Sequence, residues 1–323
     1  MEKENYSDGI KNFLDELSKE EWIMESVDRS ISFDKCEKYL NEDDEHLRDF
    51  KMVYGDDRIP EYEIVEHSSK KIITVKRNLE FETKITKFLF SNTKYVNCAE
   101  FVVEIRKLAL KLPSQFNLYF NVEKDTKSEH WCILLIWDLI RDNVIDIIKS
   151  AKDINNNYPI VIIDDCVYSG HSMDAILRDL FYKGLDINLS MYYWSERKKI
   201  EKYKKSDIIN TAICMAPYIV NNAVKILQEY TNVEILCDNY LKTFIESYND
   251  SKYFFNKKIS FNDMHYFKAC FTDENVTAIY FDHKIADCLS SFNTIYPHIV
   301  KELPSRYMIE KMNERYKSYF ILS

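Results

Sequence analysis

Two adjacent aspartates, Asp164 and Asp165, directly follow a short apolar run at residues 160–163. A Ser-Gly-His-Ser segment at residues 169–172 comes next, where a helix is expected to begin. The N-terminus of a helix offers backbone N–H groups and a positive dipole to an anion, and Gly170 lets the backbone approach that anion without an intervening Cβ. The pattern therefore indicates an anion site beside a pair of carboxylates, at one of only four glycines in the chain.

Other phosphate-binding motifs fit this segment less well. A P-loop needs G-x-x-x-x-G-K-[ST] and a dinucleotide site needs G-x-G-x-x-G, and the sequence contains neither. Haloacid-dehalogenase-like phosphatases need Asp-x-Asp, but Cys166 stands two residues after Asp164. The alternative without any ligand is that the aspartates end a strand while Ser169 or Ser172 caps a helix.

The segment VIIDDCVYSGHSM, residues 161–173, resembles the signature of the type I phosphoribosyltransferases. That signature is an apolar strand, two acidic residues, a short turn with Thr or Ser before Gly, and a Ser or Thr that opens a helix. The resemblance extends from Pro113 to near Cys237 and leaves both ends of the chain outside it. It implies an α/β fold with a parallel sheet flanked by helices.

The resemblance also implies the ligand and its contacts. Asp164 and Asp165 would bind the ribose hydroxyls of 5-phosphoribosyl 1-pyrophosphate (PRPP) or of a nucleoside 5′-monophosphate. Mg²⁺ would bridge pyrophosphate and ribose oxygens, with no protein ligand to it assigned. The 5′-phosphate would be bound by the following turn, at Tyr168, Ser169, Gly170, His171 and Ser172.

Two weaker expectations concern the rest of the ligand. Lys124 and Lys127 lie where the family has its pyrophosphate loop, although lysines in a polar loop are commonly solvated. Tyr218 follows an expected core strand and is the candidate for stacking on a base, although aromatic residues are frequent enough here for a chance placement.

Three departures from the family leave the activity open. Tyr168 stands where members acting on 6-oxopurines carry an Asp as general base, and a phenol is a poor base near neutral pH. The expected pyrophosphate loop has no glycine, and residues 151–159 are too few for the lid that excludes water in active members. One hypothesis is transfer of ribose 5-phosphate to a nucleobase. The alternative is a non-catalytic nucleotide-sensing or protein-interaction module, and a third reading is a protein-binding scaffold.

Alternating strands and helices must position this site. Their order is typical of a parallel sheet covered on both faces. We expect strands at residues 116–122, 159–164, 186–194, 211–216 and 232–237, and helices at 129–150 and 171–184. Outside this core we expect a helical first ~50 residues, two strands within 61–77, a helix at 97–112 and a strand at 276–282.

Pattern changes along the chain predict three regions. Residues 1–112 are expected to form an N-terminal α+β extension, residues 113–240 the phosphoribosyltransferase-like core, and residues 241–323 a C-terminal α/β appendage packed on the core.

Composition narrows the class of protein and of partner. The net charge of −9 gives no general attraction to nucleic acid or to anionic membranes, so neither is expected as a partner and any phosphate site must be local. A small-molecule partner, a phosphoribosyl compound or a nucleotide, is what the resemblance implies. Apolar runs end well short of the roughly 20 residues of a membrane span, and the first residues lack a signal peptide, so a cytoplasmic location is expected. The eight cysteines are widely spaced, which favours free buried thiols. The sequence allows a homo-oligomer without predicting one.

Overall fold

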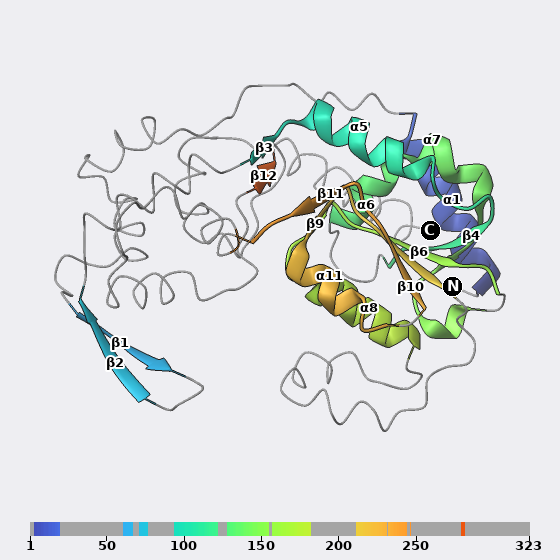
Figure 1. Ribbon diagram of the computed structural model, residues 1–323. Helices are drawn as coiled ribbons and strands as arrows, with labels where there is room; N and C mark the ends of the chain where they lie inside the picture. Colours follow the sequence, from blue (N-terminus) through green and yellow to red (C-terminus); the bar gives the residue numbers. More distant parts are fainter. Residues whose placement is uncertain are drawn as a thin grey trace, which may run out of the picture. The chain divides into compact units, whose positions relative to one another are not determined.

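The computed structural model describes residues 3–19, 61–66, 71–76, 94–121, 128–154, 157–181, 211–230, 232–243, 246 and 279–281 (Figure 1). The chain divides into two compact units, each built from separate stretches of sequence. The first contains Met1–Glu25, Ala99–Leu241 and Ser305–Ser323, and the second contains Ser26–Cys98 and Lys242–Pro304. The predicted strand at 186–194 lies outside the described residues.

Five parallel strands form the central sheet of the first unit, in the order β10-β8-β6-β4-β5. All residues of β4, β6 and β8 are buried, as expected for strands covered on both faces. The predicted α/β class, a parallel sheet flanked by helices, is thus confirmed. The strands are β4 (Phe116–Tyr119), β5 (Val144–Ile148), β6 (Ile160–Ile163), β8 (Ala212–Met215) and β10 (Val233–Leu236).

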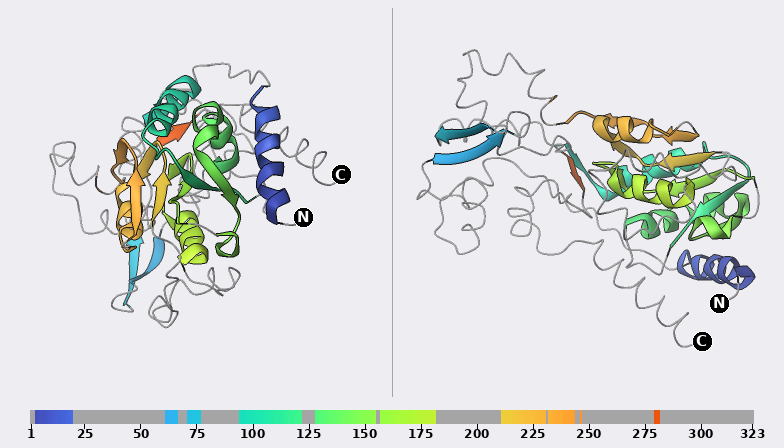
Figure 2. Two further views of the ribbon diagram at one scale, coloured as in Figure 1. Left: turned by 90° about the vertical axis from the view of Figure 1, so that its right-hand side faces the viewer. Right: turned by 90° about the horizontal axis from the view of Figure 1, so that it is seen from below.

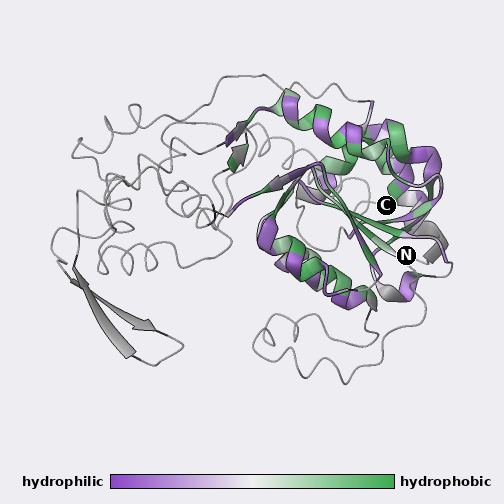
Figure 3. Cartoon of the chain, in the orientation of Figure 1, coloured by the Kyte–Doolittle hydropathy of each residue, from purple (hydrophilic) through white to green (hydrophobic). Residues whose placement is uncertain are grey.

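Helices cover both faces of this sheet, α5 and α6 on one and α8 and α11 on the other (Figures 1 and 2). On the second face, Leu177 and Leu227 pack with Ile162 and Cys214 in one buried cluster. Figure 3 shows hydrophobic and hydrophilic residues alternating along these helices, the pattern of helices with one buried face. The helices are α1 (Lys3–Leu17), α5 (Cys98–Ala109), α6 (Ser128–Leu134), α7 (Trp137–Ile140), α8 (His171–Phe181) and α11 (Asn221–Leu227).

Helix α1 lies along β5, the strand at one edge of the sheet. The Oγ atom of Ser7 accepts a hydrogen bond from the backbone N–H of Ile147 at 2.9 Å. The ammonium group of Lys11 donates to the carbonyl oxygens of Val144 and Ile145, both at 3.0 Å. Side chains of α1 thus bind backbone groups of an edge strand, which otherwise would be open to pairing with another chain.

Three adjacent strands of the sheet continue beyond it after a break of two residues. Strands β6, β8 and β10 lead into β7 (Cys166–Val167), β9 (Tyr218–Val220) and β11 (Asn239–Leu241), which form a second parallel sheet in the same order. Pro217 lies in the break of the middle strand and has no N–H to donate, which favours an interruption of the ladder here. Residues 164–165 occupy the break between β6 and β7.

The second unit contains two small sheets within its described residues. Strands β1 (Glu61–Glu66) and β2 (Lys71–Lys76) pair antiparallel, which confirms the two strands predicted within 61–77. Strands β3 (Lys94–Val96) and β12 (Ile279–Phe281) pair in parallel. In the part of the chain described here, no helix is long and apolar enough to span a membrane.

One predicted element is wrong. Residues 129–150 were expected to form a single helix, but the chain forms α6, α7, a 3₁₀ turn at Arg141–Asn143 and then strand β5. A second 3₁₀ turn, Ala151–Asp153, precedes β6. No Gly or Pro separates the helices from the strand, so the apolar residues from Trp131 to Ile148 form one continuous pattern in the sequence.

Candidate functional site

The strand order places a topological switch point between β4 and β6. Counted along the chain, the five strands occur in the spatial order 2-1-3-4-5, so the order reverses between the first strand, β4, and the third, β6. In such sheets, ligands bind outside the carboxyl ends of the strands at the switch point. Asp164 and Asp165 follow β6 at this edge, and Asn121 lies just beyond the end of β4. We call this edge the candidate site.

The two aspartates differ in their access to solvent. Asp164 is half-buried, and its Oδ1 accepts the N–H of Asp165 at 2.9 Å. Asp165 is 0% exposed, and its Oδ1 accepts the N–H of Cys166 at 2.8 Å. Asp164 is therefore the carboxylate that a ligand hydroxyl reaches more readily. Asp165 is buried and holds the backbone at the start of β7 by its hydrogen bond to Cys166.

The turn between β7 and α8 is closed by local hydrogen bonds. Ser169 Oγ accepts the N–H of His171 at 3.3 Å, and the carbonyl of Gly170 accepts the N–H of Asp174 at 2.8 Å, which begins the helix. The five predicted phosphate contacts differ in exposure. Ser172 is exposed, Ser169 and His171 are half-buried, and Tyr168 and Gly170 are buried. The Nε2 atom of His171 is itself buried.

Gly170 has two structural reasons to be a glycine. Its φ of +78° lies in the left-handed region, which side chains with a Cβ rarely adopt. A Cβ built on it would also lie 3.3 Å from the Cα of Ala223 in α11. Sequence reasoning missed this contact because Ala223 is distant in the chain. The approach of a phosphate to Gly170 stays a prediction.

The ends of β4 and β5 bring a cation to the same edge. Lys149 follows β5, and its ammonium group lies 4.9 Å from the ring centroid of Tyr6, which comes from α1. The Tyr6 hydroxyl donates to the carbonyl of Phe120 at 2.8 Å. Asn121 Nδ2 donates to the carbonyl of Lys149 at 3.4 Å, and His130 Nε2 lies 3.2 Å from the carbonyl of Asn121. Neither Tyr6 nor Lys149 was predicted. Lys149 fell inside the helix expected at 129–150, and Tyr6 is distant in the chain from the strands that it contacts.

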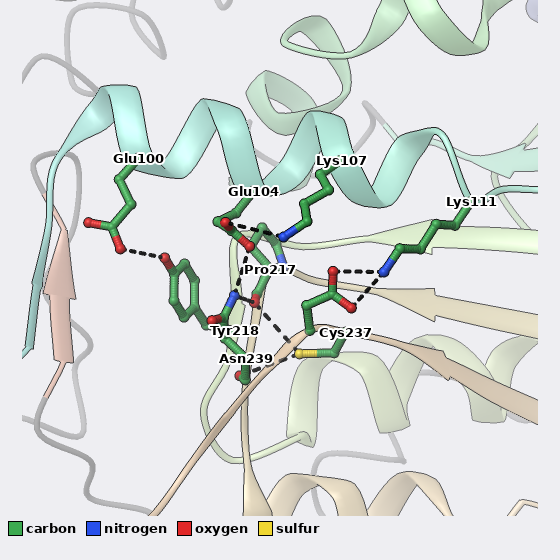
Figure 4. A network of polar contacts seen from close by, with 9 residues as sticks. Glu100, Glu104, Lys107, Lys111, Pro217, Tyr218, Cys237 and Asn239 are labelled. Carbon is green, nitrogen blue, oxygen red and sulfur yellow. Dashed lines mark hydrogen bonds and ion pairs between the residues drawn. The ribbon is translucent and has the colours of Figure 1, made fainter.

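Tyr218, predicted to stack on a base, is fully buried in β9. Figure 4 shows its hydroxyl pointing to α5, where it donates to Glu100 Oε1 at 3.4 Å. Burial, followed by the charge of Glu100, raises the pKa of Tyr218 well above its usual value. Base stacking on Tyr218 stays a prediction, and it would require the ring to be uncovered. The predicted pyrophosphate contacts, Lys124 and Lys127, lie outside the described residues.

Helix α5 and the residues just after it also bind the break that follows β10 and the start of β11. Asn239 Nδ2 donates to Glu104 Oε2 and to the carbonyl of Pro217, both at 3.1 Å. Lys111 forms an ion pair with Asp238 at 2.6 Å (Figure 4). Helix α5 therefore holds the carboxyl side of β8 and β10, and the candidate site lies toward β6 and β4.

Cys237 is the one thiol in this network, and its Sγ contacts the carbonyls of Pro217 and Asn239. Burial raises the pKa of Cys237 to about 12. The thiol is therefore protonated at neutral pH and is a poor nucleophile. Burial has the same effect on Cys214 in β8, whose pKa is raised to about 12.

The donor atoms at the candidate site fit Mg²⁺ only together with a ligand. Among the described residues there is no group of three or more His, Cys, Asp or Glu side chains that could hold a metal ion. Mg²⁺ is usually bound by one or two carboxylates plus substrate phosphates and water. Asp164 supplies one such carboxylate, while Asp165 is enclosed, and a phosphate ligand with water would supply the remaining oxygens.

Comparisons with known proteins add little to this geometry. No protein-family model matches the chain, and no curated protein matches it. Among solved structures, the AQ2163 protein from Aquifex aeolicus is similar over 72% of this chain and 84% of its own, with 11% sequence identity and a TM-score of 0.25. That score is too low to support an argument about fold or function.

Proposed function

We propose that the first unit is a type I phosphoribosyltransferase-like domain that binds PRPP or a nucleoside 5′-monophosphate. The observation that carries this proposal is the position of Asp164, Asp165 and the start of α8 directly after β6, beside the switch point. Ligands of doubly wound sheets bind at that position, and the residues there resemble the PRPP-binding signature.

In this proposal each part of the site has its own task. Asp164, half-buried and at the edge, accepts hydrogen bonds from the ribose hydroxyls. The hydroxyls of Ser169 and Ser172, with backbone N–H groups at the start of α8, bind the 5′-phosphate. Asp165 acts through the backbone by holding the N–H of Cys166 and thereby the conformation of the turn.

When bound, Mg²⁺ would supply positive charge that offsets the phosphate oxygens. Asp164 is the carboxylate best placed to contact the ion, because Asp165 is fully enclosed. If the protein is a transferase, the bond from ribose C1 to pyrophosphate breaks and a bond from C1 to a base nitrogen forms. Pyrophosphate leaves with the electron pair of the bond that breaks, and a base nitrogen that carries a proton releases it to solvent. The chain would contribute by orienting the ligand and excluding water.

A non-catalytic nucleotide-sensing or protein-interaction module is the second candidate. It is favoured by the complete burial of Asp165 and of Tyr218, two side chains to which the family resemblance assigns ligand contacts. A sensor needs only the phosphate and ribose contacts, which the exposed Ser172 and the half-buried Asp164 provide.

Calorimetric titration with PRPP and with a panel of nucleoside 5′-monophosphates, each with Mg²⁺, tests the shared part of both candidates. We expect the wild type to bind and Asp164→Asn to bind at least about tenfold more weakly, because a charge-assisted hydrogen bond is lost. Asp142→Asn is the matched control, since Asp142 is exposed and lies in the 3₁₀ turn before β5. A wild type that binds none of these ligands would refute the proposal.

Release of pyrophosphate separates the two candidates. With PRPP, Mg²⁺ and each of a panel of nucleobases, a transferase releases pyrophosphate only when its own base is present. Binding of PRPP without release for any base supports the sensor.

A further inference from the structure

A buried carboxylate, Asp174, lies in the first turn of α8 and is held by two other side chains. Its Oδ2 atom lies 2.5 Å from Nη2 of Arg178, and both side chains are almost fully enclosed, with 4% and 5% of their surface exposed. Its Oδ1 atom accepts a hydrogen bond at 2.5 Å from the hydroxyl of Tyr230, a residue that follows α11. Both carboxylate oxygens are thus occupied.

Asp174 lies close to the turn proposed to bind phosphate. Its backbone N–H donates to the carbonyl of Gly170 at 2.8 Å, so it lies one helical turn from the turn proposed to bind phosphate. Side chains on a helix lean toward its N-terminus. A negative charge there stabilises the helix but opposes a bound anion, because it offsets the positive end of the helix dipole.

A contribution to stability alone does not explain why Asp174 is paired with Arg178 and Tyr230. A buried ion pair is commonly no more stabilising than well-packed apolar residues of similar size, because both charges lose their hydration. The network does join α8 to α11, which also meet where Gly170 lies against Ala223. Burial, followed by the charge of Asp174, raises the pKa of Tyr230, so its hydroxyl keeps the proton that it donates.

We propose that Arg178 and Tyr230 are positioning residues that neutralise Asp174, so that the start of α8 retains a positive potential for a phosphate monoester. The inference rests on the proposed function and adds residues to the same site. Neither Arg178 nor Tyr230 contacts the ligand in this account. They act through Asp174, by balancing a charge that would otherwise repel the phosphate.

Two variants should then change affinity in opposite directions. Asp174→Asn removes the negative charge and leaves Arg178 positive, so phosphate binding should become tighter. Tyr230→Phe removes one donor and leaves the carboxylate less well neutralised, so binding should become weaker. Both variants remove a buried hydrogen bond and should lower the melting temperature. A purely structural role would weaken binding in both.

The experiment is calorimetric titration of the full chain with ribose 5-phosphate, and with PRPP plus Mg²⁺. For Asp174→Asn we expect affinity for ribose 5-phosphate to rise about fivefold or more, and for Tyr230→Phe to fall about threefold, the size of effect expected for partly screened charges. Asp142→Asn is the control, because it removes an exposed negative charge from the 3₁₀ turn before β5, and should stay within about twofold of the wild type.

The outcomes separate this inference from the proposed function. If the wild type binds neither probe, the proposed function fails and the inference fails with it. If the wild type binds but both variants shift affinity in the same direction, or neither shifts it, the inference alone is overturned. Should Asp174→Asn not fold, Tyr230→Phe is compared with the wild type at low and high NaCl. A deficit that shrinks with salt supports the inference, and a salt-independent deficit overturns it.

Discussion

A Cβ built on Gly170 would lie 3.3 Å from the Cα of Ala223, so the backbone just before α8 packs closely against α11. The same residue has a φ of +78°. Backbone conformation and helix packing each require a glycine here, whether or not a ligand binds. The case for a phosphate therefore depends on Ser169, Ser172 and the backbone N–H groups of the turn rather than on Gly170.

Substitution of Gly170 should destabilise the fold. We expect Gly170→Ala to lower the free energy of unfolding by about 1–3 kcal/mol, because alanine is strained at this φ and its methyl group crowds Ala223. Gly170→Val should cost more, since a β-branched residue is a poorer fit to positive φ. Urea denaturation followed by tryptophan fluorescence measures both. The valine variant therefore cannot separate phosphate binding from stability.

Gly9, in the middle of α1, is the control for this substitution. Within a helix, alanine is favoured over glycine by up to about 1 kcal/mol, so Gly9→Ala should leave stability unchanged or increased. Equal losses at both positions would show that the conformation of Gly170 is not the cause.

The contact between α1 and the core gives a second prediction. Asp15 Oδ1 accepts the indole N–H of Trp137 at 2.8 Å, and its Oδ2 lies 2.7 Å from Arg141 Nη2. Asp15→Ala leaves the N–H of a buried tryptophan without this acceptor, which should cost about 1–3 kcal/mol. Asp8→Ala, at an exposed position of the same helix, should change stability by less than about 0.5 kcal/mol. Similar losses in urea denaturation for the two variants would count against the role of Asp15.

Much of the central sheet was predictable from local sequence. The runs at 160–163 and 212–215 are apolar throughout because β6 and β8 are covered on both faces. Strands of that kind read as continuous hydrophobic runs rather than as alternating apolar and polar residues. Strand β5 was missed for the opposite reason. It lies at an edge, Ile145 and Asp146 are not fully buried, and the helix that covers it comes from the far N-terminus.

The candidate site was predictable only in its chain positions. The place of Asp164 and Asp165 after β6 followed from the sequence, but the burial of Asp165 did not. The strand continues beyond the two aspartates into β7, and that break lies level with Pro217 in a neighbouring strand. Contacts between distant segments, such as Tyr6 with Lys149, leave no local pattern in a single sequence.

The network on α5 predicts an order of stability among variants of Asn239. Asn239→Ala removes the donor shared by Glu104 and Pro217 and should cost about 1–2 kcal/mol. Asn239→Asp should cost more at pH 7, because it places a carboxylate against that of Glu104. Urea denaturation at pH 7 measures this, and equal stabilities of the two variants would contradict it.

The buried thiol of Cys214 should make stability depend on alkaline pH. Burial, with a smaller effect of Asp164, raises its pKa from 9.0 to about 12. Between these values the unfolded chain loses a proton that the folded protein keeps, so the free energy of unfolding falls as pH rises. The stabilising contribution is complete below pH 9 and is lost by about pH 12.

Comparison with Cys214→Ala isolates this effect. The wild type should lose up to about 1.4 kcal/mol per pH unit more than the variant above pH 9. The variant should be less stable at pH 7.5, because a small cavity forms in the core. Urea denaturation at pH 7.5, 9 and 10.5 gives the two slopes. Parallel slopes would mean that the thiol titrates alike in the folded and unfolded states.

Ser172 allows a test of the phosphate contact with little effect on stability. Its side chain is exposed in the first turn of α8, where its hydroxyl and the helix N-terminus face the same anion in the proposed function. Ser172→Ala should weaken binding of ribose 5-phosphate about three- to tenfold, the loss expected for one hydrogen bond to a charged group. Ser114→Ala is the matched control, since Ser114 is also exposed but precedes β4, at the opposite edge of the sheet. If calorimetry gives the same affinity for both variants, the phosphate does not bind at the start of α8.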